Sequence, residues 1–167
     1  VFIDDERYVR IVRKCVQLGL YVSIHAGVNI GAPEVVRCPP ERALRMLRAA
    51  YDGVDVAKEE RPRVVLAHLG GGFMLEETEK HLCGAFVYLD LAFTFGWEDE
   101  AQILRIIRAH GAERVLFATD SPWAGQKESV EALKRLPLTE LEQRRVLGEN
   151  AAEMLGLLLG VDEDVNE

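Results

Sequence analysis

Short apolar runs alternate with helical patterns along this chain, and each run ends on a histidine or an aspartate. Runs of this length and composition are typical of strands buried on both faces. A strand, a helix and a further strand form a βαβ unit, in which the strands are parallel and the crossover is right-handed. The sequence therefore predicts an α/β fold built on a parallel sheet. The runs are Leu20–His25, Arg63–His68, Phe86–Asp90 and Arg114–Asp120.

Helical periodicity fills the intervals between these runs. Asp5 is a good N-cap and Gly19 a good C-terminal stop, which predicts a first helix over Asp5–Leu18. Pro40 suits the first turn of a second helix. Further helices are expected over Phe73–Leu82, Trp97–His110, Lys127–Leu136, Thr139–Leu147 and Asn150–Leu158, the last two with capping-box patterns.

Composition limits the classes of function. The chain has 167 residues with 49% hydrophobic and 29% charged side chains, as in one soluble globular domain. Its net charge of −8 disfavours a nucleic-acid or anionic-membrane partner, since both need basic patches. No apolar run approaches the roughly 18 residues of a membrane span. Three cysteines without CxxC spacing indicate reduced thiols, so we expect a cytoplasmic protein.

The strand ends are where chemistry is expected. The carboxyl ends of parallel strands lie on one side of a sheet, so His25, His68 and Asp120 should converge on one surface. Two imidazoles and a carboxylate suit a divalent transition metal, above all Zn²⁺, with Mn²⁺ or another divalent ion as alternatives. Such a metal can activate water at neutral pH.

The strand-end motifs resemble those of the amidohydrolase superfamily, most closely its amidohydrolase-related branch of metal-dependent hydrolases and decarboxylases. The resemblance covers nearly the whole chain in the right order. The segment that begins at Leu147 and continues through Asn150-Ala-Ala is also similar to the last helix of that branch. The matching segments are Leu20-Tyr-Val-Ser-Ile-His25-Ala-Gly, Val64-Val-Leu-Ala-His68-Leu-Gly-Gly, Val87-Tyr-Leu-Asp90 and Arg114-Val-Leu-Phe-Ala-Thr-Asp120-Ser-Pro-Trp.

The resemblance implies a TIM-type (β/α)8 barrel, of which this chain would supply strands five to eight. It implies His25 as a metal ligand and Asp120 as both metal ligand and proton acceptor. His68 would contact the substrate or the metal-bound water and steady the developing oxyanion, while metal-activated water attacks an amide, ester or C–N bond of a small molecule. Residues 1–159 would then be the carboxyl-terminal half of the barrel, and residues 160–167 an acidic, frayed tail.

The family's His-x-His pair of strand one is absent from this sequence. A complete barrel typically has about 250 residues, so we expect roughly 100 further residues before Val1. A half barrel also leaves two strand edges unpaired, which could pair with a second copy of the chain. Three functions therefore stay open: a metal-dependent hydrolase, a non-oxidative decarboxylase with the same metal centre, and a non-catalytic half-barrel that serves assembly or binding.

Some neighbouring residues favour structural roles. Asp90 is expected to be structural or to face the substrate, and Gly70–Gly72 to let the backbone turn sharply. Trp123 and Phe95 are candidates for the wall of a substrate pocket. Cys38 is expected to be an ordinary loop cysteine.

Overall fold

The computed structural model describes residues 1–55 and 61–157. Within these residues one parallel sheet forms, with its strands in the order β1-β2-β3-β4. This confirms the predicted α/β fold of parallel βα units. Each strand is shorter than its apolar run. In β1, β2 and β4 the ladder ends before the strand-end residue, whereas β3 includes Asp90. The strands are β1 (Val22–Ile24), β2 (Val64–Leu66), β3 (Tyr88–Asp90) and β4 (Val115–Leu116).

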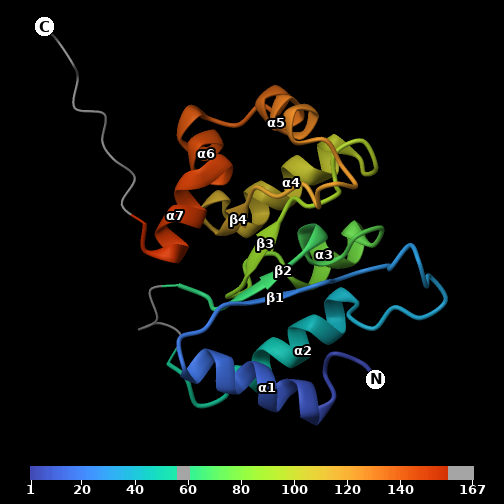
Figure 1. The fold of residues 1–167 in the computed structure, drawn as a ribbon, viewed down its shortest axis with the longest axis vertical. Coiled ribbons are helices and arrows are strands. Elements are labelled where there is room, and N and C mark those ends of the chain that lie inside the picture. The colour runs from blue at the N-terminus through green and yellow to red at the C-terminus, as the bar shows by residue number, and fades with distance from the viewer. Residues whose placement is uncertain (56–60, 158–167) are drawn as a thin grey trace, which may run out of the picture.

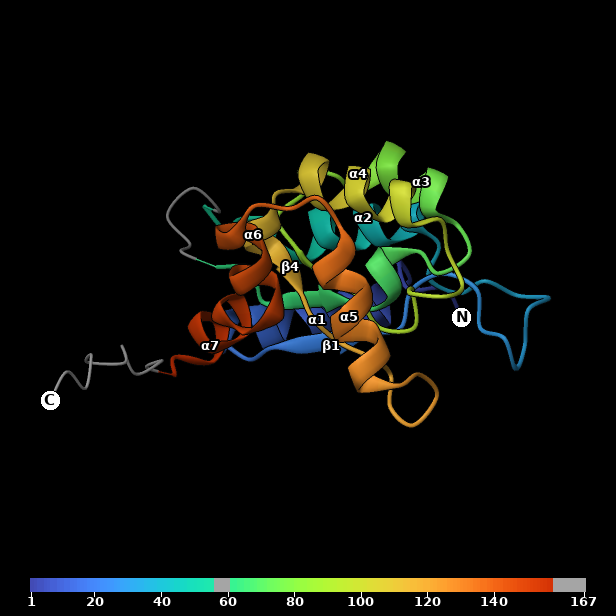
Figure 2. The ribbon, with the colours of Figure 1, turned by 90° about the horizontal axis from the view of Figure 1, so that it is seen from above.

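The helices form two groups beside the sheet. The first four contact one another in chain order, and Figure 1 shows α1 and α2 together at the β1 end. The last three gather beyond β4 (Figure 1), and Figure 2 shows the same arrangement from above. The first group is α1 (Glu6–Gln17), α2 (Pro40–Ala50), α3 (Leu75–His81) and α4 (Glu100–His110); the second is α5 (Gln126–Arg135), α6 (Glu140–Arg144) and α7 (Asn150–Leu155).

Helix starts follow the capping residues rather than the apolar pattern. Asp5 caps α1 by accepting a hydrogen bond from the Arg7 N–H, as expected. The fourth helix begins at Glu100 instead of Trp97, because Asp99 accepts hydrogen bonds from the backbone N–H groups of residues 101 and 102. Trp97 is thereby left in the loop after β3, where it is free to take part in a site.

The two predicted capping boxes have different outcomes. Thr139 and Glu142 form one at the start of α6, as predicted. The box expected at Asn150 is wrong, since α6 continues through a π-helical segment, Arg145–Glu149, directly into α7. The Asn150 side chain is buried and donates to the carbonyl oxygens of Ala112 and Val115 at 2.6 and 2.7 Å. The carbonyl groups of Ala112 and Val115 need a hydrogen-bond donor, and the Asn150 side chain supplies it instead of capping a helix.

The core lies mainly between the sheet and its helices. Alternate strand residues, including Val64, Leu66, Leu89 and Val115, belong to one large apolar cluster with the helices. The opposite face carries a smaller cluster of Val65, Tyr88 and Leu116. Period-two alternation thus gives the sheet one thickly covered face and one thinly covered face. Ser23 of β1 lies on the thinly covered face by this alternation and is exposed.

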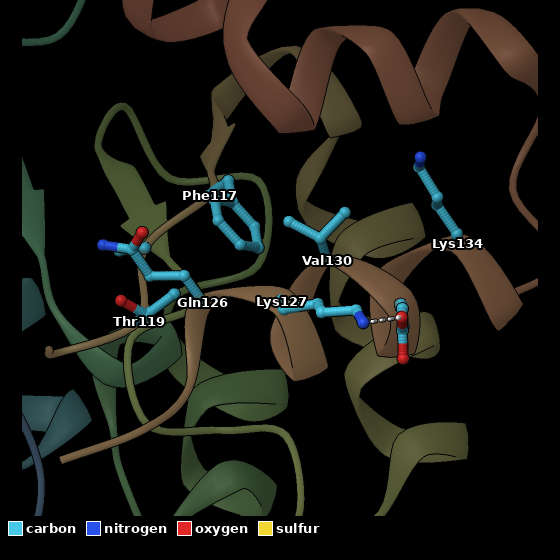
Figure 3. Close-up of a pocket in the computed structure, with 8 residues that line it drawn as sticks. Phe117, Thr119, Gln126, Lys127, Val130 and Lys134 are labelled. Atoms are coloured by element: carbon cyan, nitrogen blue, oxygen red, sulfur yellow. Dashed lines mark ion pairs between the residues drawn. The ribbon is translucent and has the colours of Figure 1, made fainter. Parts of the chain in front are cut away.

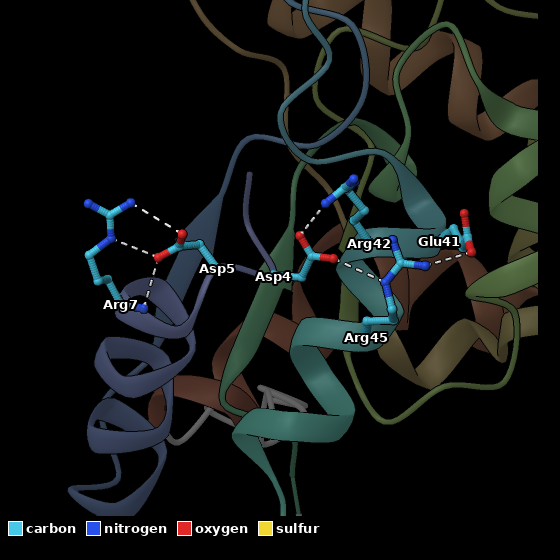
Figure 4. Close-up of polar contacts among 6 residues, drawn as sticks. All are labelled: Asp4, Asp5, Arg7, Glu41, Arg42 and Arg45. Atoms are coloured by element: carbon cyan, nitrogen blue, oxygen red, sulfur yellow. Dashed lines mark hydrogen bonds and ion pairs between the residues drawn. The ribbon is translucent and has the colours of Figure 1, made fainter. Parts of the chain in front are cut away.

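Ion pairs join the amino-terminal segment to α2 (Figure 4). The Asp4 carboxylate accepts hydrogen bonds from Arg42 at 2.7 Å and from Arg45 at 3.0 Å. Arg45 also pairs with Glu41, and the Arg42 guanidinium lies 3.9 Å from the centre of the Phe2 ring. Burial raises the pKa of Asp4, but the hydrogen bonds from the two arginines outweigh it and hold that pKa below its ordinary value.

The two outer strands each have one neighbour. In the described part of the chain, β1 pairs only with β2 and β4 only with β3. The predicted pairing of these edges with a second copy stays a prediction. No helix within residues 1–55 and 61–157 is both long enough and apolar enough to cross a bilayer. The division of the chain at residue 159 also stays a prediction, since residues 158–167 lie outside the described ranges.

Candidate functional site

The three predicted strand-end residues lie around one cavity. His25, His68 and Asp120 all line a space of about 630 Å³ beyond the carboxyl ends of the strands. The structure therefore brings them together as the parallel sheet requires. The roles assigned to each of them stay predictions.

The two histidines are joined by a hydrogen bond whose direction can be worked out. His68 Nδ1 lies 2.8 Å from the Ala92 carbonyl oxygen, which can only accept, so Nδ1 carries the proton. In the neutral ring, His68 Nε2 then has the lone pair, and it lies 3.0 Å from His25 Nδ1. His25 Nδ1–H must therefore donate. His25 Nε2 keeps a lone pair that neither bond of this pair uses.

Electrostatics favour a neutral His25. Burial lowers the pKa of His25, and the neighbouring His68 lowers it further. The Val28 backbone and the Asp120 carboxylate act in the opposite direction but do not outweigh them. A neutral imidazole is the form that can bind a metal or accept a proton.

Asp90 fixes the backbone beneath the histidine pair. Its carboxylate oxygen Oδ1 accepts hydrogen bonds from the N–H groups of His68 at 3.0 Å and Ala92 at 2.9 Å. Burial raises the pKa of Asp90, and these two hydrogen bonds oppose the shift without cancelling it. Asp90 therefore positions both partners of the His68–Ala92 bond, in agreement with the expected structural role.

Backbone strain is concentrated at the cavity. Among the residues that the structure describes, five other than glycine have positive φ, including His68 at 58° and Asp120 at 60°. Phe73 at 59° and Phe93 at 52° also line the cavity, so only Leu69 of the five lies outside its lining. Such conformations cost on the order of 1–3 kcal/mol each and cluster at functional sites.

The glycines after the histidines allow two loops to touch. A Cβ on Gly27 would lie 2.2 Å from the Gly72 backbone nitrogen, so only glycine fits there. The contact is closed by Val28 N–H donating to the Gly72 carbonyl and Gly72 N–H donating to the Ala26 carbonyl. The Gly70–Gly72 segment thus supports the site as a sharp turn, as expected.

Aromatic side chains form one wall of the cavity. Trp123 lines it, as expected, but Phe95 does not, because Phe95 is packed in the main core. Phe93, Trp97 and Phe73 are the wall residues that sequence reasoning missed. The aromatic-rich loop that follows β3 carried the signal, but sequence alone could not show which of its rings turn outward.

The donors described here fit part of a metal site. His25 Nε2 and Asp120 supply the nitrogen and oxygen ligand types that zinc and related ions use. Within residues 1–55 and 61–157, however, no three His, Cys, Asp or Glu side chains lie close enough together to hold an ion. A catalytic zinc usually takes three protein ligands, and His25 and Asp120 supply two.

Cys38 is excluded as a reactive ligand by its surroundings. The side chain is 5% exposed, and burial raises the pKa of its thiol to about 12. At neutral pH it is therefore protonated and inert, as expected for an ordinary buried cysteine.

A second cavity, of about 610 Å³, lies between the end of β4 and α5 (Figure 3). Its lining includes Phe117 and Val130, with Lys134 and the Lys127–Glu131 ion pair at 3.9 Å. It contains neither histidine nor strained backbone. The first cavity is therefore the better candidate for chemistry.

Comparison with known proteins concerns the family and the fold of this chain. The model of a family described as amidohydrolase matches residues 2–157. No curated protein matches. Among solved structures, the chain is similar to a Polaromonas dihydroxybenzoic acid decarboxylase with bound manganese, at 14% identity and a TM-score of 0.64, over 93% of this chain and 55% of that one.

Two further solved structures are similar to the same extent. A 5-carboxyvanillate decarboxylase from Sphingomonas paucimobilis matches at 19% identity and a TM-score of 0.65, over 95% of this chain and 56% of its own. A zinc-bound amidohydrolase from Burkholderia multivorans matches at 19% identity and a TM-score of 0.62, over 93% and 59%. The chain thus spans a little more than half the length of these structures, and at such identities the likeness concerns the fold.

Proposed function

The chain belongs to the amidohydrolase family, and on that premise we propose that it forms the carboxyl-terminal half of a metal-dependent hydrolase barrel acting on a small molecule. The observation that best supports this proposal is that two imidazoles and a carboxylate line one cavity at the strand ends. The substrate bond would be an amide, an ester or a related C–N bond.

Each residue has a distinct task in this proposal. Asp120 accepts a proton from the attacking water, because it is an exposed carboxylate on the rim of the cavity. The His25–His68 pair faces the same space. Its two ring N–H groups are used in the bonds to Ala92 and within the pair, so it offers the lone pair of His25 Nε2 as a metal ligand, and His68 holds His25 in that orientation. Asp90 and the Ala92 carbonyl hold His68 in the required orientation.

A divalent metal would be held by His25 and Asp120 together with ligands from the rest of the enzyme, and when bound it supplies a Lewis acid that polarises the scissile bond and acidifies water. Zinc is our first choice of metal for this nitrogen and oxygen donor set, with manganese as the alternative. The related structures with bound manganese and bound zinc support a divalent ion.

A decarboxylase that uses the same centre is the second candidate. The observation that favours it is that solved structures similar to this chain include decarboxylases of aromatic acids. Product analysis separates the two reactions: a hydrolase incorporates ¹⁸O from labelled water into its product, whereas a decarboxylase releases CO₂ without doing so.

Asp120→Asn in the native-length protein tests the proposal. The amide cannot act as a base at neutral pH and is a poorer metal ligand, so kcat should fall by about 10²- to 10⁴-fold with the thermal midpoint unchanged. Asp52→Asn is the matched control, because this exposed aspartate lies beyond the carboxyl end of α2, away from the cavity.

The control should keep both its activity and its metal content, measured by inductively coupled plasma mass spectrometry. A parent protein without divalent metal, or an Asp120→Asn variant with the turnover of the parent, would favour the third reading, a non-catalytic half-barrel module.

A further inference from the structure

The turn that begins at His68, residues 68–73, has a backbone conformation that side chains rarely allow. Positive φ occurs at His68 (58°), Leu69 (52°), Gly70 (75°) and Phe73 (59°). Three of these residues are not glycine, so the turn carries a conformational cost. Strained backbone of this kind persists only where the surrounding structure fixes it, and the contacts at the two ends of the turn therefore matter.

A carboxylate holds each end of the turn. At its start, the Asp90 carboxylate accepts a hydrogen bond from the His68 N–H at 3.0 Å. At its end, the Glu98 carboxylate accepts one from the Phe73 N–H at 2.5 Å. Asp90 is the last residue of β3, and Glu98 lies in the loop between β3 and α4. One continuous stretch of chain thus fixes both ends.

Glu98 is itself firmly anchored. Its N–H donates to the carbonyl oxygen of Thr94, a residue that is 1% exposed and whose hydroxyl donates to the Leu91 carbonyl. The next residue, Asp99, caps α4. Because the backbone is held on both sides and the Glu98 side chain is half-buried, its carboxylate is a fixed acceptor rather than a mobile surface group.

Gly72, directly before Phe73, connects the turn to the loop that follows His25. The Gly72 N–H donates to the Ala26 carbonyl at 3.2 Å, and the Gly72 carbonyl accepts from the Val28 N–H at 2.9 Å. Ala26 is the residue after His25 in the chain. A displacement at Phe73 would therefore be transmitted through Gly72 to the backbone that carries the His25 ring.

The same glycine lies against His68. A Cβ placed on Gly72 would be 3.1 Å from the His68 Cβ, so the two residues are in close contact. The His68 ring in turn donates to the Ala92 carbonyl and accepts from His25. Both imidazoles thus depend on the position of Gly72, which the residue after it helps to fix.

Stability alone explains Glu98 less well. Burial raises the pKa of Glu98, and the hydrogen bond from the Phe73 N–H opposes this shift without cancelling it. The partial loss of water around the carboxylate therefore offsets much of what the bond contributes. An apolar side chain would avoid that loss, but it could not accept a hydrogen bond from Phe73.

We propose that Glu98 is a positioning residue of the site: it holds the Phe73 N–H, and thereby fixes the turn that orients the His25–His68 pair and keeps His25 Nε2 available to a metal. Its consequence for catalysis rests on the proposed function. The arrangement of the two rings, however, is measured in protein without metal or substrate.

The experiment compares Glu98→Ala with Glu98→Gln in native-length protein. Both variants remove the charge, but glutamine keeps an oxygen that can accept from the Phe73 N–H. Glu76→Ala is the matched control, because Glu76 is an exposed glutamate on the first turn of α3, three residues from Phe73. It repeats the change of charge without removing the acceptor.

Two measurements use metal-free protein. Hydrogen exchange of the Phe73 amide reports the bond itself and should become about tenfold faster in Glu98→Ala. Nitrogen NMR of ¹⁵N-labelled histidine reports the ring pair: the parent should carry a proton on Nδ1 of both His25 and His68, and Glu98→Ala should show mixed tautomers. Glu98→Gln and Glu76→Ala should match the parent.

Zinc affinity gives a third measurement, by competition with a chromophoric chelator. The dissociation constant should rise about tenfold in Glu98→Ala, at the lower end of the effect of residues that orient metal ligands. Glu98→Gln should restore most of the affinity, because the acceptor returns without the charge.

Other results overturn the inference. Parent-like histidine spectra and zinc affinity in Glu98→Ala would show that the bond anchors a loop and nothing more. Equal losses in Glu98→Ala and Glu98→Gln would show that charge, and not the acceptor, matters. If Glu98→Ala disturbs the ring pair in a protein that binds no metal, the positioning role stands and the proposed function fails. If Asp120→Asn abolishes turnover while Glu98→Ala leaves the rings unchanged, the function stands and the positioning role fails.

Discussion

Histidines occur in two contrasting surroundings in this molecule. His110 is 1% exposed in the core, with its ring nitrogens 3.2 and 3.0 Å from the carbonyl oxygens of Leu82 and Val87. At the cavity, His25 and His68 use three of their four ring nitrogens in fixed bonds, and the remaining nitrogen, His25 Nε2, has no part in them. His110 faces only backbone carbonyl groups, to one of which its neutral ring can donate, whereas the bonds of the cavity pair leave His25 Nε2 for chemistry.

Asp90 tests whether nearness to the cavity or burial separates the two regions, because it contacts the cavity residue His68 yet is buried. Asp90→Ala leaves the N–H groups of His68 and Ala92 without their acceptor. We expect a loss of about 3 kcal/mol in the free energy of unfolding, since each buried unpaired group costs roughly 1–3 kcal/mol. Urea denaturation measures it. Asp90→Asn keeps an acceptor oxygen and should lose far less; equal losses would contradict the hydrogen-bond explanation.

His110→Leu tests the core side of the comparison. The Val87 carbonyl loses the ring nitrogen that it faces, whereas the Leu82 carbonyl still accepts from the Ala85 N–H. One unpaired group predicts a loss of about 2 kcal/mol in the free energy of unfolding. His25→Leu, at the exposed rim, should stay within about 0.5 kcal/mol of the parent. If both variants lose the same stability in urea, the contrast between the regions is wrong.

Much of this contrast could be anticipated from sequence, because strand-end placement follows from topology alone. The apolar runs predicted which residues leave the sheet on one side, and His25, His68 and Asp120 do line one cavity. The partners of those residues could not be predicted. The acceptor of His68 is the backbone carbonyl of residue 92, which has no sequence signature, and its position depends on a turn fixed by Asp90.

The errors have a common physical origin as well. Phe95 and Asn150 were placed by local pattern, one as a pocket wall and the other as a helix cap. In the folded chain Phe95 fills the core and Asn150 serves carbonyl groups 35 and 38 residues away. Long-range packing and hydrogen-bond requirements override local preference, and a single sequence does not contain their geometry.

The pH dependence of stability tests the contrast between the core and cavity histidines through a smaller expected effect. Burial lowers the pKa of His110, and the nearby Arg114 also lowers it, against the backbone carbonyls and Glu113. The unfolded chain therefore binds a proton near pH 6.5, whereas folded His110 binds it only at lower pH. The free energy of unfolding should fall as the pH drops below about 6.5, by at most about 1.4 kcal/mol per pH unit from this group, and stay level above it. Comparing parent with His110→Gln between pH 5 and 8 should show a shallower slope in the variant; a steeper slope would reverse the assignment.

Asp4 offers the smallest effect and the most direct test of what burial contributes. Like Asp90 it accepts two hydrogen bonds, here from Arg42 and Arg45, but 35% and 45% of these arginine side chains is exposed. Water competes for the partners and salt screens the charges, so Asp4→Asn should cost no more than about 1 kcal/mol. The loss should shrink in about 1 M NaCl, where the Debye length falls to about 3 Å, whereas the loss in Asp90→Ala should not, because its partners are backbone N–H groups in a buried site. If Asp4→Asn were as costly as Asp90→Ala and equally insensitive to salt, the number of hydrogen bonds, and not their removal from water, would set the stability of both regions.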